Sequence, residues 1–395
     1  MASMRASKHR ARMTKQKQAD PLRVQQFVET LVGDDMHAKR VLSLSNGVLG
    51  VMHAASLSIH AIGQGLAASK ELVRKHSVKQ VDRLLSNSKL DIWELFGLWV
   101  PYVVGERREL VVALDWTEFD GDGQGVIAAY LITSHGRATP LLWKTVEKRT
   151  LKENRNRYED EVLDRLREVV PDGTKVTILA DRGFGDQRLY DWLQSIGWDF
   201  AIRFRECIEV EHNEERKRAR DWMTPTGRAK MLKQVKVTKE STPIPAVVLV
   251  KKPKMKEAWC VATTRKDLSA AQVTKLYGRR FTIEESFRDV KDIRFGFGLS
   301  ATHIRNCGRR DRLLFIAAIA EALLKLLGAA GEARGLDRLL KTNTSKKRQL
   351  SLLRQGLIWY EFLPGLREDR FRALMEEFDS LVRAQTVFCE AFGVL

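Results

Sequence analysis

The chain contains the segment Tyr277-Gly-Arg-Arg-Phe-Thr-Ile-Glu-Glu-Ser-Phe-Arg-Asp-Val-Lys291. If this segment is helical, about 100° of rotation per residue brings Tyr277, Arg280, Glu284 and Lys291 within roughly 60° of the helix circumference. Arg288 adds a further cation to the same side, since it follows Glu284 by one helical turn. One face therefore carries an aromatic ring, three cations and a carboxylate. This combination suits a site where the carboxylate holds a metal ion and the cations hold phosphate oxygens.

A purely structural interpretation of the same residues is also open. Thr282 followed by Glu285 is the pattern of a helix capping box, and Glu284 with Arg288 is an ordinary surface pair. A capping box at Thr282 predicts that a helix begins there. Tyr277 would then lie on a preceding turn, and the rest of the chain has to decide between the two interpretations.

The composition favours a polyanionic partner. The 395 residues include 68 Lys or Arg against 50 Asp or Glu, a net charge of +18. Such an excess is typical of proteins that bind nucleic acid, although a generic basic protein can also have it. A chain of this length can bury a substantial core and form about two or three domains.

Cysteine spacing and hydropathy indicate a cytoplasmic protein. The four cysteines lie too far apart for a metal knuckle or a dense disulfide framework, and we expect them to be buried thiols in a reducing compartment. The N-terminus lacks the apolar core of a signal peptide. The most apolar run, residues 313–327, is interrupted by Glu321 and Lys325, so no membrane span is predicted.

The N-terminal quarter is predicted to be basic and helical. Residues 1–23 contain seven Lys or Arg and one acid, which indicates a flexible basic arm. Residues 24–105 show helical periodicity and are predicted to be a DNA-binding region. Within them, two short amphipathic segments, 57–68 and 78–85, flank a basic linker that contains Lys70, Arg74, Lys75 and His76. This pattern is that of a helix-turn-helix whose second helix offers Lys79, Gln80 and Arg83 to a DNA groove. A plain packing bundle would give the same pattern.

Residues 106–205 alternate between strand and helix patterns. The first three strands follow one another through short turns, which indicates an antiparallel meander, whereas strands separated by helices are expected to have parallel neighbours. The prediction is an α/β fold with a mixed five-stranded sheet flanked by helices. The predicted strands are 109–115, 125–133, 139–147, 175–180 and 199–205, and the predicted helices are 154–170 and 185–196.

The composition changes after residue 205. Residues 206–265 are rich in Lys, Arg, Glu and Pro and contain three strand-like runs, so we predict a β-rich insertion. Residues 266–300 would return the chain to the core with the Tyr277–Lys291 segment. Residues 301–395 are predicted to be helical and could mediate dimerisation.

Three acids are predicted to converge. Asp115 ends one predicted buried strand, Asp181 follows another, and Glu284 lies on the predicted helix. Carboxylates from separate elements bind Mg²⁺ or Mn²⁺ when substrate phosphate completes the coordination shell. Two such ions, about 3.5–4 Å apart, can activate a water or a 3′-hydroxyl in phosphodiester chemistry. Five nearby acids compete for this role: Glu118, Asp120, Asp122, Asp186 and Glu285. For Asp120 and Asp122 local backbone capping in a turn is expected, and for Asp186 a helix N-cap.

This arrangement resembles DDE transposases of bacterial insertion sequences, specifically the IS-four group, whose signature is Tyr-x2-Arg-x3-Glu-x6-Lys. Tyr277, Arg280, Glu284 and Lys291 match that spacing at every position. The segments Asp115-Trp-Thr and Asp181-Arg-Gly-Phe look like the first two acidic motifs of the family. The resemblance covers residues 108–295 well, and it implies a ribonuclease H-like core interrupted by a β-rich insertion.

The resemblance also implies roles for individual residues. Asp115, Asp181 and Glu284 would be the catalytic metal ligands for two Mg²⁺ ions, with Mn²⁺ as an alternative. Tyr277, Arg280 and Lys291 would hold phosphates of the transposon end, and Arg288 lies on the same side. Trp259 is the nearest match to a tryptophan that stacks on a flipped base, with Phe281 as a second aromatic. Trp259 lies in a strand-like run, however, and could instead pack inward.

We therefore expect a bacterial, nucleoid-associated transposase that binds terminal inverted repeats, cuts DNA and joins the 3′ end to target DNA, with a homodimer pairing two ends. The resemblance implies a cut-and-paste route through hairpin ends. Two other classes fit the same sequence. One is a DNA-binding protein of the same fold without catalysis, and the other is a structure-selective nuclease.

Overall fold

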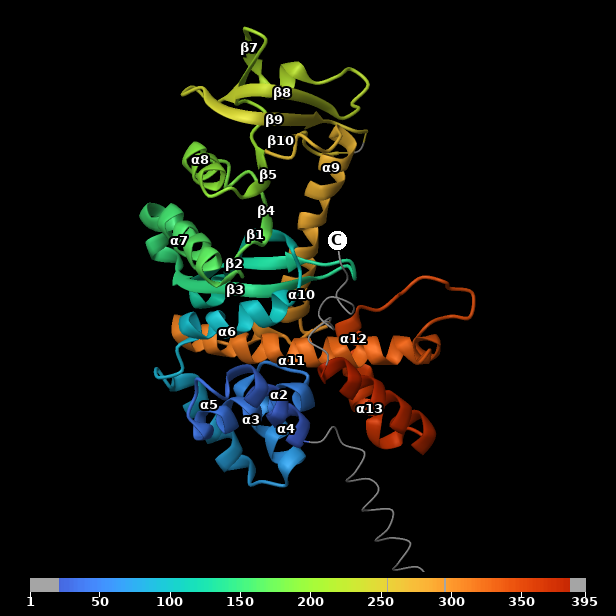
Figure 1. The fold of residues 1–395 in the computed structure, drawn as a ribbon. Coiled ribbons are helices and arrows are strands. Elements are labelled where there is room, and N and C mark those ends of the chain that lie inside the picture. The colour runs from blue at the N-terminus through green and yellow to red at the C-terminus, as the bar shows by residue number, and fades with distance from the viewer. Residues whose placement is uncertain (1–20, 254, 295, 384–395) are drawn as a thin grey trace, which may run out of the picture.

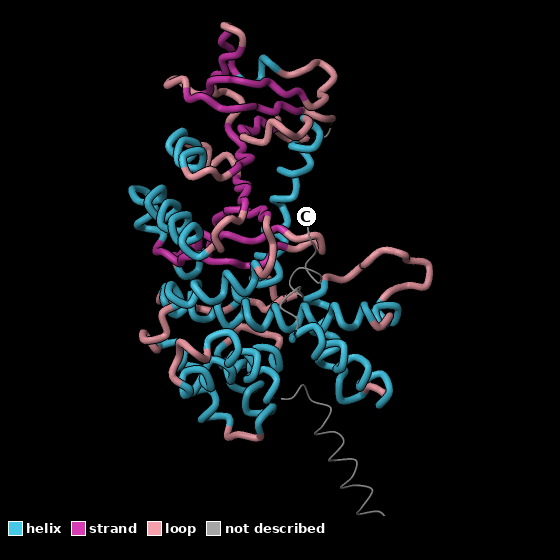
Figure 2. Tube along the Cα trace, viewed as in Figure 1, coloured by secondary structure: helices cyan, strands magenta, loops and turns pink. Residues whose placement is uncertain are grey.

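A computed structural model describes residues 21–253, 255–294 and 296–383. The basic arm predicted for residues 1–23 lies outside this range except for residues 21–23, which begin helix α2. The strands lie in the upper half of the molecule with a few helices beside them, and the lower half is helical, as Figure 2 shows. The β-rich insertion therefore lies at one end, and the two terminal helical regions lie at the other (Figure 1).

Within the described residues, a ten-stranded sheet runs through the molecule in the order β3-β2-β1-β4-β5-β10-β9-β8-β6-β7. β2 pairs antiparallel with β1 and β3, whereas β4 pairs in parallel with β1 and β5. The strands are β1 Glu109–Phe119, β2 Gln124–Ile132, β3 Ala138–Glu147, β4 Lys175–Ala180, β5 Asp199–Phe204, β6 Glu209–His212, β7 Glu215–Arg218, β8 Lys230–Val237, β9 Thr242–Val250 and β10 Trp259–Thr263.

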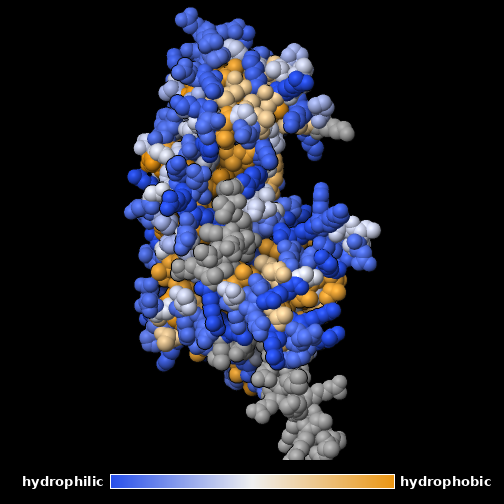
Figure 3. All heavy atoms as spheres, turned by 45° about the vertical axis from the view of Figure 1, so that its right-hand side comes forward, coloured by the Kyte–Doolittle hydropathy of each residue, from blue (hydrophilic) through white to orange (hydrophobic). Residues whose placement is uncertain are grey.

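The first five strands confirm the predicted mixed sheet of a ribonuclease H-like core. They form its antiparallel meander and its two parallel pairs, as their order in the sequence predicted. The insertion continues this sheet, because β10 pairs antiparallel with β5. β6 and β7 are additional to the sequence prediction. On one face of the insertion end, Figure 3 shows an apolar patch among hydrophilic residues.

Helices pack along the core half of the sheet. α7 (Lys148–Val169) contacts β2 and β3, and α6 (Ile92–Val104) and α11 (Cys307–Ala333) contact β3. The indole nitrogen of Trp99 on α6 donates a 3.0 Å hydrogen bond to the carbonyl of Pro140 on β3. In Figure 1, α11 runs between the sheet and the N-terminal helices, so it connects the two halves of the molecule.

By length and composition, α11 could cross a membrane, and so could α3 (Ala38–Ala54) and α4 (Ile59–Lys70) together if their bent pair were one span. In this structure 89% of the most apolar window of α11 is buried inside the protein. Glu321 and Lys325, which interrupt its apolar run, form an internal ion pair of 2.8 Å. This burial is what a helix in the core of a globular protein shows.

The N-terminal helices form a bundle below α11. α4 and α5 are joined by only three residues, 71–73, which is a helix-turn-helix connection length. The predicted basic linker is wrong in its bounds, because Arg74, Lys75 and His76 already belong to α5. The helices of this region are α2 Pro21–Val32, α3 Ala38–Ala54, α4 Ile59–Lys70 and α5 Arg74–Ser86.

The remaining helices return the chain from the insertion to the core and complete the C-terminal region. α8 (Gln187–Ser195) connects β4 to β5. α9 (Ala270–Gly278) packs against β5 and β9, and α10 (Thr282–Lys291) against β3. α12 (Leu352–Phe362) and α13 (Glu368–Arg383) both pack against α11.

Tyr277 and Glu284 lie on different helices, but the expectation that Tyr277 lies on a turn is wrong, because it lies within α9. A 3₁₀ turn, Arg279–Phe281, joins α9 to α10. The predicted capping box at Thr282 is wrong, because its hydroxyl donates instead to the carbonyl of Arg279 at 2.8 Å. The backbone is already helical at Phe281, with φ −59° and ψ −13°, so no extended N-cap residue exists there. The capping box lies at the start of α9 and is formed by Ser269 and Gln272.

The cysteine prediction is partly wrong. Cys260 is buried and Cys307 is partly buried, but Cys207 is exposed. Cys389 lies outside the described residues.

Candidate active site

Two of the predicted acids lie side by side at one level of the sheet. β1 and β4 are parallel neighbours, and Leu114 pairs with Ala180. Asp115 and Asp181 each follow one residue later. Asp181 lies just beyond β4, whereas Asp115 lies inside β1, so the predicted strand end at Asp115 is wrong. In parallel strands, residues at equivalent positions project to the same face. Asp181 accepts a 2.7 Å hydrogen bond from the backbone N–H of Gly183, which holds its carboxylate in the turn after β4.

Arg280 links the first and third acids. Its guanidinium donates to Oδ2 of Asp115 at 2.9 Å and to Oε1 of Glu284 at 2.7 Å. The Arg280 side chain is only 6% exposed and that of Asp115 16%, whereas Glu284 is 52% exposed. Glu284 therefore lies at the solvent-facing rim of the cluster, and Asp115 lies at its base.

The pKa of Asp115 reflects its burial and its charged neighbours. Burial, together with the negative charges of Asp181 and Glu284, raises the pKa of the Asp115 carboxyl to about 6 against the opposing effect of Arg280. The single guanidinium therefore does not outweigh burial and the neighbouring carboxylates. A site of this kind favours additional positive charge.

Asp115 and Glu284 open into a cleft of about 590 Å³. Lys291 enters it from the end of α10, and its ammonium donates to Oγ1 of Thr117 at 3.1 Å and to the carbonyl of Glu118 at 2.7 Å. Burial lowers the pKa of Lys291. Arg288 also lines the cleft and pairs with Glu285. The lining residues are Asp115, Trp116, Thr117, Glu284, Phe287, Arg288, Lys291, Asp292 and Ser300.

The acids fit a divalent cation in donor type and charge. Carboxylate oxygens are the ligands that Mg²⁺ and Mn²⁺ prefer. No three His, Cys, Asp or Glu side chains in the described part of the chain already enclose a metal position. Between Asp115 and Glu284, the Arg280 guanidinium takes the place of a shared cation. For Asp115 and Glu284 to bind the same metal ion, Arg280 must therefore release at least one of the two carboxylates.

An aromatic cluster lies next to Arg280. The Trp259 ring stacks on Phe281, with centroids 5.8 Å apart and an interplanar angle of 30°. It also meets the edge of Tyr277 at 5.0 Å. Tyr277 is 1% exposed and Phe281 39%, while Trp259 is partly buried. The structure thus brings these three predicted residues together, with Phe281 the most accessible of them.

Lys79 and Arg83 lie elsewhere. Both are exposed on α5, where they line a separate groove of about 850 Å³ together with Arg40 and His76. In Figure 1, α5 lies across α11 from the strands that carry the acids. These two residues and the carboxylate cluster therefore form two distinct surfaces.

The competing acids all have other partners. Asp186 caps α8 as predicted, accepting from the N–H of Arg188 at 3.0 Å. The expected local capping by Asp120 and Asp122 is wrong. Asp120 pairs with Lys148, and Asp122 accepts from the distant Arg310 and from the N–H of Ile304. Glu118 also pairs with Lys148, and Glu285 pairs with Arg288.

The sequence interpretation missed Glu159 on α7. Its carboxylate accepts from the indole nitrogen of Trp116 at 2.7 Å and from Nε of Arg155 at 3.0 Å. Trp116 directly follows Asp115, so this contact fixes the chain at the first acid. Burial raises the pKa of Glu159, whose residue is 8% exposed. An acid on the buried face of an amphipathic helix was the available signal.

A comparison with protein families places the chain. The family model described as "Transposase DDE domain" matches residues 106–320, which is more than half of the 395 residues. No curated protein matches the chain. Proteins of this family act on DNA and depend in general on divalent metal ions. The matched range contains Asp115, Asp181 and Glu284. The chain belongs to the transposase DDE domain family.

Proposed function

We propose that this chain is the transposase of a bacterial insertion sequence of the IS-four group. It would bind the terminal inverted repeats of its element, cut the DNA by metal-dependent hydrolysis and join the 3′ end to target DNA by transesterification. The observation that carries this proposal is the Arg280 bridge, because it joins Asp115 of β1 to Glu284 of α10 at 2.9 and 2.7 Å beside an open cleft.

In this proposal Asp115, Asp181 and Glu284 hold two Mg²⁺ ions, or Mn²⁺ in their place. Bound ions of this kind activate the attacking oxygen and stabilise the leaving oxygen. Lys291 and Arg288 line the same cleft and supply positive charge to the scissile phosphate. Arg280 would be free to hold a phosphate oxygen of bound DNA once one of its two carboxylate partners holds a metal ion.

The aromatic cluster supplies a stacking surface for the end of the transposon. Phe281 is partly exposed and lies against Trp259, and the cation of Arg280 lies 4.7 Å from the Phe281 ring centroid. A base splayed from the duplex would stack here, an interaction of about 1–3 kcal/mol per base. The buried Tyr277 supports the Trp259 ring from its edge and borders Arg280.

The N-terminal bundle would bind duplex DNA in the groove of α3 and α5. Lys79 and Arg83 are exposed there, and the structure records no ion-pair partner for either within the described residues. Two such chains would pair the two ends of the element as a homodimer in the bacterial cytoplasm.

The test replaces Glu284 with Gln. Short inverted repeats that bracket the gene supply the DNA substrate, and cleavage is measured in Mg²⁺. Loss of a metal ligand should slow cutting by more than the roughly 10–100-fold typical of residues that only support ligands. Asp120→Asn is the matched control, because Asp120 is a nearby acid that pairs with Lys148. Undiminished cutting by Glu284→Gln would contradict the assignment.

The reaction products distinguish the proposed transposase from the two other classes of protein. A transposase yields joined strand-transfer products, whereas a structure-selective nuclease yields cleavage alone. A DNA-binding protein without catalysis would bind the repeats and yield neither product.

A further inference from the structure

α10 presents different residues to two sides of the molecule. Glu284, Arg288 and Lys291 face the cleft. At 100° per residue, Asp289 lies about 140° around the helix from Glu284 and about 160° from Lys291. Asp289 therefore projects away from the cleft, and its side chain is only 4% exposed. The contacts on this far side of α10 set the angle at which the helix presents Glu284, Arg288 and Lys291 to the cleft.

The start of β3 and the turn that precedes it contact this far side of α10. Ser286 of α10 accepts from the backbone N–H of Ala138 at 2.8 Å, and its hydroxyl lies 2.9 Å from the Ala138 carbonyl. Ala138 begins β3, which is the edge strand of the sheet. The hydroxyl thus satisfies outward-facing backbone groups that an edge strand otherwise leaves unpaired. This contact fixes the position of α10 along the strand.

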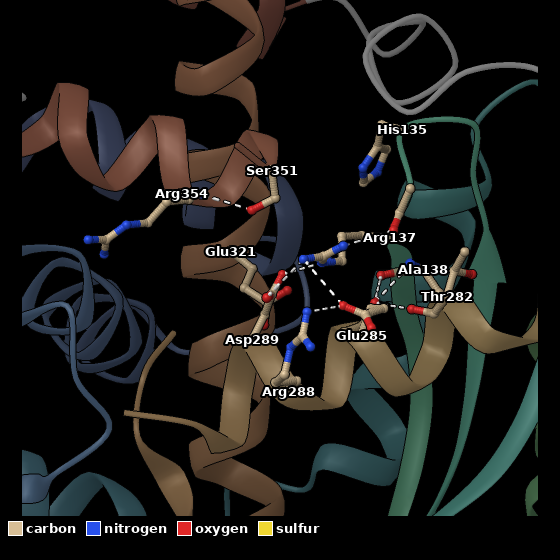
Figure 4. Close-up of polar contacts among 12 residues, drawn as sticks. His135, Arg137, Ala138, Thr282, Glu285, Arg288, Asp289, Glu321, Ser351 and Arg354 are labelled. Atoms are coloured by element: carbon tan, nitrogen blue, oxygen red, sulfur yellow. Dashed lines mark hydrogen bonds and ion pairs between the residues drawn. The ribbon is translucent and has the colours of Figure 1, made fainter. Parts of the chain in front are cut away.

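Arg137 adds a second contact from the same turn. Its Nε donates to Oδ2 of Asp289 at 2.7 Å, and its Nη2 lies 3.5 Å from Oδ1. The same Nη2 lies 3.7 Å from Oε2 of Glu285. Figure 4 shows Arg137 reaching from the turn to both acids, with Glu321 of α11 behind them. A planar guanidinium held by two carboxylates restricts rotation of the helix, whereas a single point contact would not.

We propose that Arg137 is a positioning residue for the metal-binding carboxylate Glu284, and that it acts through Asp289 on the opposite face of α10. The proposal rests on the function proposed above. A shift of about 1 Å at a reacting group can cost roughly 100-fold in rate, so the orientation of α10 has chemical consequences. Arg137 contacts Asp289 and Glu285 and does not pair with any of the three acids.

Metal binding without DNA gives the first test. Mn²⁺ is titrated calorimetrically into the full chain as wild type, Arg137→Ala, Glu284→Gln and the double variant. Arg137→Ala alone should weaken Mn²⁺ binding by about 10–100-fold, the range for residues that orient metal ligands. In the Glu284→Gln background the same change should have no further effect, because Glu284 is the group through which Arg137 acts. Equal effects of Arg137→Ala in both backgrounds would overturn the proposal.

The single variants separate this inference from the proposed function. If Glu284→Gln leaves Mn²⁺ affinity unchanged, the metal site itself is wrong, and the inference fails with it. If Glu284→Gln weakens binding and Arg137→Ala does not, the metal site stands and only the positioning role fails. Neither result depends on DNA cleavage.

Two further variants guard against a general loss of structure. Arg137→Lys keeps the positive charge but loses the planar fork, and it should give an intermediate loss of Mn²⁺ affinity even if Arg137→Ala does not fold. Lys341→Ala breaks an ion pair with Asp337 whose side chains are similarly shielded, 16% and 20% exposed. It should leave Mn²⁺ affinity unchanged, and an equal loss there would overturn the proposal.

Hydrogen exchange of the metal-free protein reports on the helix directly. Arg137→Ala should speed amide exchange in α10 and leave the amides of β1 and β4 unchanged. Unchanged protection of α10 would show that the ion pair does not hold the helix.

Discussion

Arg280 shows what a single residue contributes beyond its sequence motif. Spacing predicts that it shares a face with Glu284, and the two are paired at 2.7 Å. Its second partner, Asp115, is 165 positions away, so no local pattern could reveal it. The pairing places a cation where two carboxylates converge. The Tyr-Arg-Glu-Lys signature thus encodes an ion-paired cluster as well as a potential phosphate contact.

His135, in the turn beside Arg137, predicts a pH-dependent stability. Burial lowers its pKa to about 2, and the positive charges of Lys325, Arg348 and Arg137 act in the same direction. Below about pH 6.5 the unfolded chain therefore takes up a proton at this residue while the folded chain does not. Stability should fall as the pH falls, by on the order of 2 kcal/mol between about pH 7.5 and pH 5.

His135→Asn should remove that part of the pH dependence. Urea denaturation of the variant at the two pH values should give a smaller difference than in the wild type. His60→Asn, at an exposed histidine on α4, controls for the loss of an imidazole. Identical pH slopes in the wild type and His135→Asn would show that another group carries the effect.

At the level of elements, the strands with apolar runs were predictable. The prediction for β4 matches its bounds, 175–180, because a buried parallel strand reads as a continuous apolar segment. β7, Glu-Arg-Lys-Arg at 215–218, consists of four exposed, charged residues. It forms the far edge of the sheet, where charge discourages pairing with other chains. Such a strand has no apolar pattern to detect.

Some residues of the candidate site were likewise predictable from the sequence, and others were not. Asp115, Asp181 and Glu284 were identifiable because each ends or occupies an element with a strong pattern. Arg137, Asp289 and Glu159 were not, because their roles depend on contacts between elements distant in the sequence. Sequence reasoning therefore predicts the groups that face the substrate better than those that support them from behind.

The crossing of α11 and α12 gives a prediction about packing. A Cβ atom on Gly356 would lie 1.8 Å from the carbonyl oxygen of Leu324, and one on Gly328 would lie 2.1 Å from that of Leu352. Both obstacles are backbone atoms, which cannot rotate away. Gly356→Ala should therefore force the helices apart and lower the free energy of unfolding by about 1–3 kcal/mol, as overpacking does.

Gly365→Ala supplies the control for this substitution, because no atom lies within 4 Å of its added Cβ. Its stability should equal that of the wild type or exceed it slightly. Thermal unfolding of the two variants measures the difference. A Gly356→Ala protein as stable as the wild type would mean that the helices can separate freely.

In the whole molecule, α11 joins the two surfaces to which we assign DNA contacts. β3 and α10 lie on one side of it, and the bundle that contains α5 lies on the other (Figure 1). Arg309, near the start of α11, pairs with Asp82, the one acid of α5, at 2.7 Å. This pairing offsets the negative charge of Asp82 beside the basic residues of α5. The fold therefore leaves Lys79 and Arg83 as a cationic surface at a fixed position relative to the acids.

Salt dependence of DNA binding tests this surface. The log of the binding constant should fall by about 0.9 for each tenfold rise in salt per phosphate neutralised. If Lys79 and Arg83 each contact one phosphate, the double variant Lys79→Gln, Arg83→Gln should reduce that slope by about 2. Arg370→Gln with Arg372→Gln on α13 removes the same net charge from another part of the molecule, and should leave the slope unchanged. Equal reductions in both double variants would show that total charge, and not the α5 groove, governs binding.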